Sequence, residues 1–291
     1  MKPKIIFIAT PEFGAIVLNK LVEANLSPIL VITAPDRPVG RKQLITPPPV
    51  KALAQKHNLP VIQPEKINEA KEKIQGLEPD LIVVAGYSQI LPKEILDIPK
   101  YSSLNLHPSL LPRWRGPSPI EFTIIAGDKK TGVSLIKMTE KVDAGPIVGK
   151  TEIGLLGKET YQALHDKLGR LAGALLVETI PRWLEGEITP KEQDESQTTY
   201  TKILKKEDGQ IDWQKPVRYI ERQIRALNPW PGAYTVIEGK IIKILKAEVL
   251  EKQGKECLAP KEIQMEGKKA ISFEDFLRGY PDILKKIPQI C

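Results

Sequence analysis

Short apolar runs alternate with segments of helical spacing along the first part of the chain. These runs have the length and composition of buried parallel strands. Strands are expected at residues 4–9, 29–33, 61–62, 81–85, 104–107, 133–137 and 147–152. Helices are expected at residues 13–24, 51–57, 120–126 and 161–184, and a loop rich in Pro and Arg at residues 35–49. Strands that alternate with helices favour βαβ units, so we predict an α/β fold with a doubly wound, mostly parallel sheet.

The pattern changes after Gly186, where periodicity fades. Residues 188–204 are polar and are interpreted as a linker between two domains. The spacing beyond this linker predicts a small second domain, with a helix at residues 216–226 and strands at 234–237 and 241–245. We therefore expect a first domain at residues 1–187 and a second at residues 205–291, sizes that each suit one domain.

The charge and the cysteine count narrow the class of protein. A net charge of +7 favours an anionic partner, although a solvated basic surface without nucleic acid explains it equally well. Cys257 and Cys291 show no metal-ligand spacing, so we expect neither a disulfide nor a metal site, and a reducing compartment. No signal segment or membrane span is recognised. The protein is expected to be cytoplasmic and monomeric.

Candidate chemistry follows one predicted strand. Open α/β sheets bind ligands at the carboxyl ends of their strands, and the strand at residues 104–107 ends in Asn105-Leu106-His107. Residues two apart in a strand share a face, so Asn105 and His107 can converge, and Asp143 lies in the loop after the next long strand. An imidazole is a base or acid near pH 7, and a carboxamide N–H stabilises an oxyanion. On spacing alone, a strand-end histidine that is bonded to backbone remains the alternative.

Residues 105–116, NLHPSLLPRWRG, resemble the signature of the folate-dependent formyltransferases. The resemblance implies a doubly wound first domain and transfer of a formyl group from 10-formyltetrahydrofolate to an amine. It also implies that Asn105, His107 and Asp143 are the catalytic residues. The run Ser109, Leu110, Leu111 and Pro112 is expected to line the folate site.

Two N-terminal features resemble the members of that family that formylate methionyl-tRNA. Residues 10–13 read Thr-Pro-Glu-Phe, where the enzymes that formylate a ribonucleotide have a glycine-rich turn for phosphate. Residues 34–51 resemble the loop that enters the tRNA acceptor stem. Arg41 and Lys42 near its tip are expected to contact tRNA, unless the loop is only a Pro-stiffened part of the surface.

Residues 208–235 resemble the start of the second domain of the same members, a small β-barrel of oligonucleotide-binding type. Three arginines spaced i, i+4 and i+7 fall on one helical face and are expected to bind tRNA: Arg218, Arg222 and Arg225. We interpret Trp213, Ile220 and Trp230 as the core of this domain. The predicted partner is therefore initiator methionyl-tRNA.

Departures from the pattern leave other members of the family open. Pro108 and Pro146 resemble the ribonucleotide enzymes instead, and the stretch between residues 245 and 263 is short for a complete barrel. The alternatives are an amino-sugar nucleotide formyltransferase, which leaves the basic regions unexplained, and a non-catalytic RNA-binding protein, which does not need the three polar residues. A dinucleotide-dependent oxidoreductase is disfavoured because no G-x-G-x-x-G follows the first strand.

Overall fold

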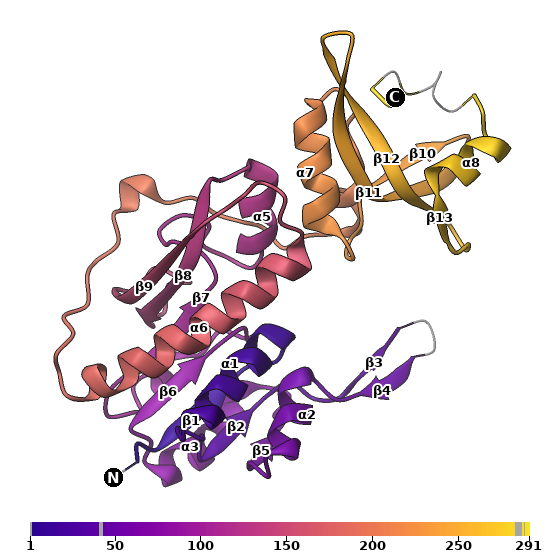
Figure 1. The fold of residues 1–291 in the computed structure, drawn as a ribbon. Coiled ribbons are helices and arrows are strands. Elements are labelled where there is room, and N and C mark those ends of the chain that lie inside the picture. Colours follow the sequence, from indigo (N-terminus) through magenta and orange to yellow (C-terminus); the bar gives the residue numbers. More distant parts are fainter. Residues whose placement is uncertain (1, 41–42, 283–286, 288) are drawn as a thin grey trace. The chain divides into compact units, whose positions relative to one another are not determined.

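The computed structural model describes residues 2–40, 43–282, 287 and 289–291. Arg41 and Lys42, two of the residues expected to contact tRNA, lie outside the described residues. The chain divides into two compact units (Figure 1). Unit 1 comprises Met1–Gly116, Thr131–Ile153 and His165–Tyr200, and unit 2 comprises Pro117–Lys130, Gly154–Leu164 and Thr201–Cys291. The domain bounds at residues 187 and 205 stay a prediction.

Unit 1 is built on a seven-stranded sheet of order β5-β2-β1-β6-β7-β8-β9 (Figure 1). Its strands are β1 (Ile5–Ile8), β2 (Leu30–Ile32), β5 (Val61–Ile62), β6 (Leu81–Val84), β7 (Ser103–His107), β8 (Lys130–Lys137) and β9 (Ile147–Gly154). The pairings from β5 to β7 are parallel and β7 pairs with β8 antiparallel, so the predicted mostly parallel sheet is confirmed.

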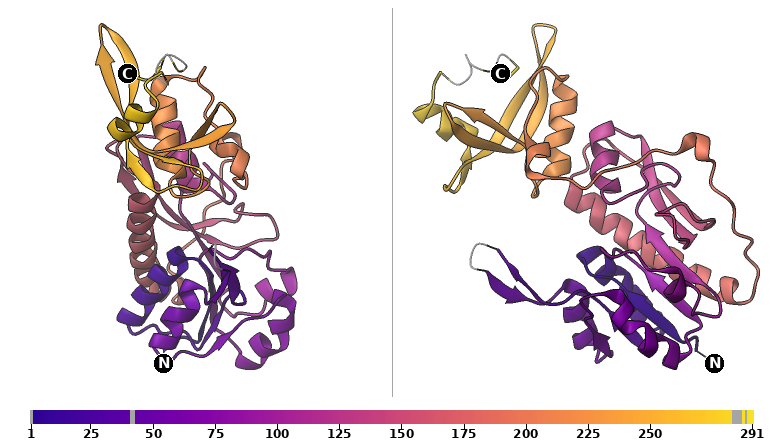
Figure 2. Two further views of the ribbon diagram at one scale, coloured as in Figure 1. Left: turned by 90° about the vertical axis from the view of Figure 1, so that its right-hand side faces the viewer. Right: turned by 180° about the vertical axis from the view of Figure 1, so that it is seen from behind.

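Helices cover both faces of this sheet because its strands are apolar on both sides. They are α1 (Glu12–Glu23), α2 (Pro49–Lys56), η1 (Ile67–Ala70), α3 (Lys71–Leu77), α4 (Lys93–Leu96) and α6 (Tyr161–Leu184). Ile6 and Ile82 pack with Ile74 of α3 and Ile95 of α4 in one cluster. On the other face α1 and α6 lie side by side, where Gly169 lets α6 approach Ile16 of α1 (Figure 2).

The predicted loop at residues 35–49 contains a short β-hairpin that the composition did not reveal. Strands β3 (Arg37–Val39) and β4 (Leu44–Thr46) pair antiparallel. The carboxylate of Asp36 fixes the start of the hairpin, because it accepts from Lys51 Nζ at 2.6 Å and Gln63 Nε2 at 2.7 Å. Prolines lower strand propensity, but an isolated edge pair of three residues tolerates Pro38.

Unit 2 holds a four-stranded antiparallel sheet of order β10-β11-β12-β13. Its elements are α5 (Pro119–Ala126), η3 (Lys206–Gly209), α7 (Val217–Leu227), β10 (Tyr234–Ile237), β11 (Lys240–Lys252), β12 (Lys255–Met265), β13 (Ala270–Ser272) and α8 (Phe273–Gly279). The predicted antiparallel β-domain is confirmed. Pairings among the described residues join the strands in series and none joins β10 to β13, so these pairings leave the sheet open. The short stretch at residues 245–263 is accounted for by β11 and β12, which run longer than the spacing predicted.

The core of unit 2 includes only part of what was expected. Ile220 is fully buried, and Trp213 packs against the same cluster with its indole N–H donated to Thr235 Oγ1 at 3.0 Å. Trp230 is 59% exposed, so the prediction that it belongs to the core was wrong. It lies between Pro229 and Pro231, where the chain leaves α7 before β10 begins.

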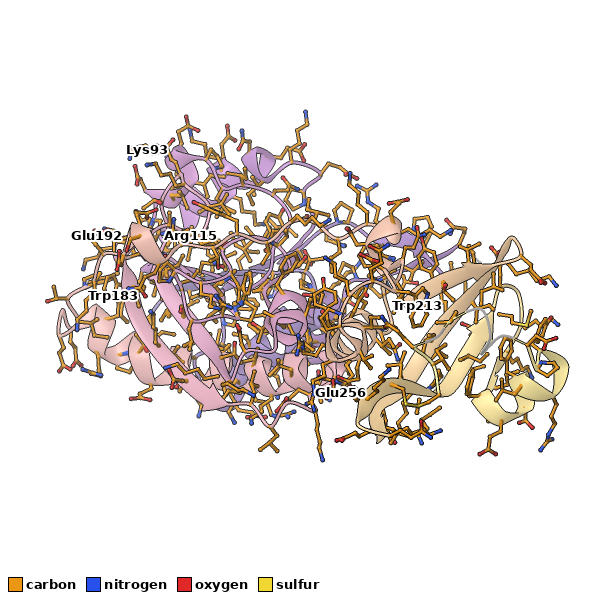
Figure 3. The ribbon with its side chains drawn as sticks, turned by 90° about the horizontal axis from the view of Figure 1, so that it is seen from above. Lys93, Arg115, Trp183, Glu192, Trp213 and Glu256 are labelled. Atoms are coloured by element: carbon orange, nitrogen blue, oxygen red, sulfur yellow. A yellow bond between two sulfur atoms is a disulfide. The ribbon has the colours of Figure 1, made fainter. Side chains whose placement is uncertain are left out.

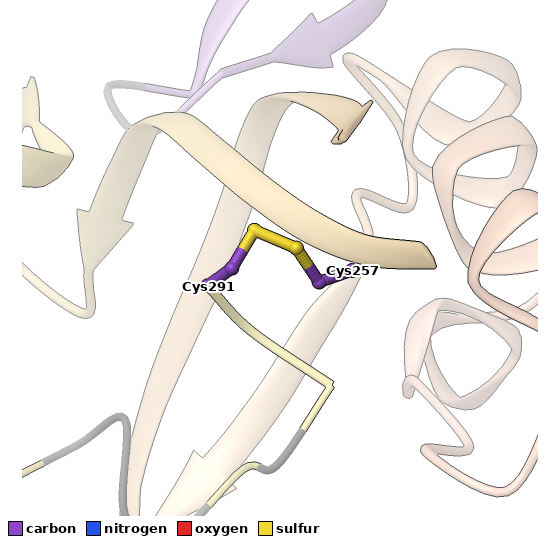
Figure 4. Close-up of a disulfide and its surroundings, with 2 residues drawn as sticks. All are labelled: Cys257 and Cys291. Carbon is purple, nitrogen blue, oxygen red and sulfur yellow. A yellow bond between two sulfur atoms is a disulfide. The ribbon is translucent and has the colours of Figure 1, made fainter. Parts of the chain in front are cut away.

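Cys257 of β12 and Cys291 form a disulfide with a Cα–Cα distance of 5.6 Å (Figure 4). The expectation of no disulfide was therefore wrong. Residues 289–291 run along β12, since Leu258 N donates to Gln289 O at 2.7 Å and Cys291 N donates to Leu258 O at 3.0 Å. A separation of 34 residues gives no hint of that pairing in the sequence. Among the described helices, none has both the length and the apolar character needed to cross a membrane.

Candidate active site

Asn105, His107 and Asp143 come together in unit 1 as the strand geometry predicts. Asn105 and His107 lie on β7, and Asp143 lies in the loop that joins β8 to β9. Asn105 Nδ2 donates to Asp143 Oδ1 at 3.3 Å, and His107 Nδ1 lies 3.5 Å from Asp143 Oδ2. The His107 and Asp143 side chains are only 6% and 11% exposed, so this electrostatic contact is largely shielded from water.

His107 is held at both ring nitrogens. Its Nε2 lies 2.8 Å from the carbonyl oxygen of Trp114. A carbonyl only accepts, so Nε2 must carry the hydrogen, and Nδ1 is left facing the Asp143 carboxylate. The expected histidine–carboxylate contact and the alternative of a backbone-bonded histidine are thus both present in one side chain.

The Asp143 carboxylate accepts a third contact, from the N–H of Gly116 to Oδ2 at 2.8 Å. The backbone of Asp143 is left-handed, with φ of 51°. The loop is narrow here, because a Cβ on Gly145 would lie 1.8 Å from Lys137 O. Gln193 Nε2 donates to Asp143 O and to Gly145 O, at 2.8 Å each, and these two bonds hold the backbone of the loop.

The run from Ser109 to Pro112, expected to line a folate site, is shaped by groups that the sequence did not single out. Ser134 Oγ accepts from Leu111 N at 3.0 Å and donates to Ser109 O at 2.8 Å. Lys150 Nζ donates to Leu111 O, and burial lowers the pKa of this ammonium. The side chains of Ser109 and Leu111 are fully buried, so they set the course of the backbone.

Arg115 is a positively charged side chain that is buried inside unit 1. It is 2% exposed, donates to Gln193 Oε1 from Nε at 3.1 Å and Nη2 at 2.9 Å, and pairs with Glu195 at 2.7 Å. Its hydrogen bond holds the pKa of the Glu195 carboxyl below the usual range. Figure 3 marks Arg115 and, from the same segment as Gln193, Glu192. Gln193 and Glu195 lie inside the predicted linker, whose polar composition gave no sign of these contacts.

The three arginines of α7 in unit 2 share one face, as their spacing predicts, but have different surroundings. Arg218 is 69% exposed and pairs with Glu256 at 2.6 Å (Figure 3 labels Glu256). Arg222 Nε donates to Ile125 O of α5 at 2.9 Å. Arg225 is 13% exposed, pairs with Glu221 at 2.5 Å and donates to Glu159 O. Two of the three therefore fasten α7 within unit 2. Across the described residues, no group of three His, Cys, Asp or Glu side chains is arranged to hold a metal ion.

Comparison with known proteins identifies relatives over nearly the whole chain. The family model for formyl transferase matches residues 3–180, and that for the formyl transferase C-terminal domain matches residues 203–257. The methionyl-tRNA formyltransferase of Bacillus licheniformis is 44% identical over 299 residues, which cover 95% of this chain and 95% of the relative.

Two solved structures share the fold at low sequence identity. The methionyl-tRNA formyltransferase from Clostridium thermocellum has a TM-score of 0.59 at 22% identity, and covers 90% of this chain and 98% of its own. HypX from Aquifex aeolicus, solved in complex with tetrahydrofolic acid, has a TM-score of 0.63 at 17% identity. That match covers 99% of this chain and 48% of HypX, so the chain spans about half of that protein.

Proposed function

This chain belongs to the formyl transferase family, and we propose that it transfers the formyl group of 10-formyltetrahydrofolate to the α-amine of methionyl initiator tRNA. The observation that carries the proposal is the convergence of Asn105, His107 and Asp143 in a chain that matches a methionyl-tRNA formyltransferase along 95% of its length. We propose that it acts as a monomer in the cytoplasm.

In the proposed reaction, the neutral amine nitrogen attacks the formyl carbon and forms a tetrahedral intermediate with a negatively charged oxygen. Asn105 Nδ2 carries two hydrogens, and only one is directed at Asp143, so the other is free to stabilise that oxygen. The bond between the formyl carbon and folate nitrogen N10 then breaks. The amine loses one proton, N10 gains one, and tetrahydrofolate leaves.

His107 and Asp143 are proposed to manage the proton that the amine releases. Since His107 Nε2 is bonded to Trp114 O, its Nδ1 is the nitrogen that exchanges a proton with the Asp143 side. Asp143 accepts from Asn105 and Gly116 at the same time, so one carboxylate fixes both the oxyanion donor and the imidazole. A group that orients two others in this way is preorganised for the transition state.

The folate is proposed to lie along the backbone of Ser109, Leu110, Leu111 and Pro112. The side chains of Ser109 and Leu111 are buried, and Ser134 Oγ bonds the backbone of both residues, which supports a fixed course for this segment. A rigid backbone of this kind loses little conformational freedom when an extended ligand binds, which favours affinity.

The tRNA is proposed to meet Arg41, Lys42 and the basic face of α7. Arg218 is the arginine of α7 most available to a phosphate, because its side chain is 69% exposed. Arg222 and Arg225 contribute charge to the same face while they hold α7 in unit 2.

The proposal is tested by offering the purified protein 10-formyltetrahydrofolate with two acceptors in parallel, methionyl initiator tRNA and an amino-sugar nucleotide. We expect formyl-methionine on the tRNA and no formylated sugar. Transfer to the sugar nucleotide alone would keep the reaction and overturn the acceptor.

The tRNA contact is tested by Arg218→Ala, with Arg278→Ala as a matched control on α8, where the arginine is 79% exposed. We expect Arg218→Ala to raise the KM for tRNA several-fold and to leave the KM for folate unchanged, since one phosphate contact is lost. Equal KM values for tRNA in the two variants would remove Arg218 from the proposed contact.

A further inference from the structure

We propose that Gln193 is a positioning residue of the formyl-transfer site, whose side-chain amide fixes the main chain of Asp143 so that the carboxylate faces Asn105 and His107. The inference rests on the proposed function for its kinetic consequence. Among the described residues, the hydrogen bonds of Gln193 go to Arg115 and to two backbone carbonyls, and none goes to the three side chains. It acts through the backbone of the Asp143 loop.

The contacts of Gln193 are complete and buried. The residue is 8% exposed, its Nε2 donates to Asp143 O and Gly145 O at 2.8 Å each, and its Oε1 accepts twice from Arg115. Both amide hydrogens and both oxygen lone pairs are therefore used. A buried amide with every hydrogen-bonding position filled has one favourable orientation.

Arg115 decides which way the amide points. The guanidinium has only donors, so the oxygen of Gln193 must face it and the NH₂ must face the Asp143 loop. The reversed amide would set NH₂ against the guanidinium and the oxygen against two carbonyls. Arg115 is itself held in place, because its guanidinium pairs with Glu195 and its backbone N–H donates to Thr199 O at 2.9 Å. The orientation of one amide thus links the 105–116 segment to the Asp143 loop.

The Asp143 loop needs such an external hold. Asp143 has a left-handed backbone, with φ of 51°, which is uncommon for residues other than Gly and less favourable than the ordinary regions even for Asp. Both carbonyls that Gln193 binds flank the turn, at Asp143 and Gly145. Without the two N–H groups these carbonyls lose a hydrogen-bond donor, and the loop is free to shift. His107 Nδ1 is already 3.5 Å from the carboxylate, so little displacement breaks that contact.

The first experiment replaces Gln193 with Glu, which keeps the shape and an acceptor for Arg115 and removes both donors to the loop. The matched control is Gln197→Glu, the same change at an exposed glutamine of the same segment. We expect Gln193→Glu to lower kcat roughly 10- to 100-fold with both KM values within about threefold, because misplaced catalytic groups lower the rate of chemistry. Gln197→Glu should retain wild-type kcat. A folded Gln193→Glu protein with wild-type kcat would overturn the inference.

A second measurement separates positioning from general stability. In the Asp143→Ala background, single-turnover rates should be the same with Gln or Glu at position 193, because the group through which Gln193 acts is gone. An equally large loss in both backgrounds would show that Gln193 does not act through Asp143.

A third measurement does not depend on activity. The NMR signals of the His107 ring report its contact with Asp143, and they should shift in Gln193→Glu in the same direction as in Asp143→Ala and stay unchanged in Gln197→Glu. Wild-type ring signals in Gln193→Glu would refute the inference. A wild-type protein that formylates no acceptor would overturn the proposed function, while the ring signals would still decide the role of Gln193.

Discussion

Two stretches of chain hold Asp143, and they contact different parts of this residue. The stretch at residues 105–116 contacts its carboxylate, through Asn105, His107 and the N–H of Gly116. The stretch at residues 191–200 contacts its main chain, through Gln193. The first supplies groups that take part in the chemistry, and the second supplies geometry. Changes in the first should therefore remove catalytic groups, and changes in the second should misplace groups that are still present.

The largest effect is expected from Asn105→Ala. Removal of one oxyanion donor typically lowers the rate by roughly 10²- to 10³-fold, more than the loss expected for a displaced loop at Gln193. Single-turnover formyl transfer measures it, with the melting temperature as a check on folding. The comparison would fail if Asn105→Ala were the milder of the two.

Glu121, on α5 just beyond the first stretch, offers a pH-dependent test outside both. Burial raises the pKa of its carboxyl from 4.5 to about 7. A raised pKa in the folded state means that the native protein holds the proton longer, so stability falls as pH rises from about 4.5 through 7. Glu121→Gln should therefore be more stable than wild type by about 2–3 kcal/mol at pH 8 and nearly equal at pH 4.5. Denaturant titrations of both proteins at the two pH values measure this. A difference in unfolding free energy that is the same at pH 4.5 and pH 8 would contradict it.

Ser134→Ala removes the hydroxyl that supports the first stretch from below. A buried N–H and a buried carbonyl lose their common partner, which should lower the free energy of unfolding by about 1–2 kcal/mol. The KM for folate should rise more than kcat falls, because the backbone of residues 109–112 loosens. Steady-state kinetics measure both changes. The control is Ser196→Ala, which removes an exposed hydroxyl in the second stretch and should leave kcat and the KM for folate unchanged.

The smallest effect is expected at Glu195, which anchors the second stretch to Arg115. The hydrogen bond from Arg115 lowers the pKa of this carboxyl. A lowered pKa in the folded state gives stability that is present above the ordinary value of 4.5 and is lost as pH falls through the folded value. The difference in melting temperature between wild type and Glu195→Gln should therefore shrink as pH falls from 6 towards 3, about the usual range for carboxyl titration. Glu192→Gln is the control, and a constant difference would argue against the Arg115 contact.

The sequence indicated the first stretch well and the second hardly at all. Asn105 and His107 are two apart in a strand, which fixes their common face locally, and the apolar runs predicted most of the sheet. Gln193 meets Arg115 across 78 residues, and its polar neighbours are typical of a linker. Positioning residues of this kind act through backbone contacts, which any amide can make, so residue type alone does not reveal them.

In unit 2, the spacing of the arginines in α7 predicted their common face but not the groups that they contact. The arginine face of α7 follows from helical geometry, yet the carbonyls of Ile125 and Glu159 that accept from Arg222 and Arg225 come from distant segments. The same holds for Cys257 and Cys291, which a tail running along β12 brings together. Periodicity predicts which side chains share a face and leaves open what packs against that face.

The most direct test of this account is single-turnover formyl transfer from 10-formyltetrahydrofolate to methionyl initiator tRNA, with wild type and His107→Ala compared at saturating concentrations of both substrates. We expect wild type to form formyl-methionyl-tRNA and His107→Ala to be slower by roughly 10²-fold, with its tRNA affinity and melting temperature retained. Near-wild-type transfer by His107→Ala would contradict the account.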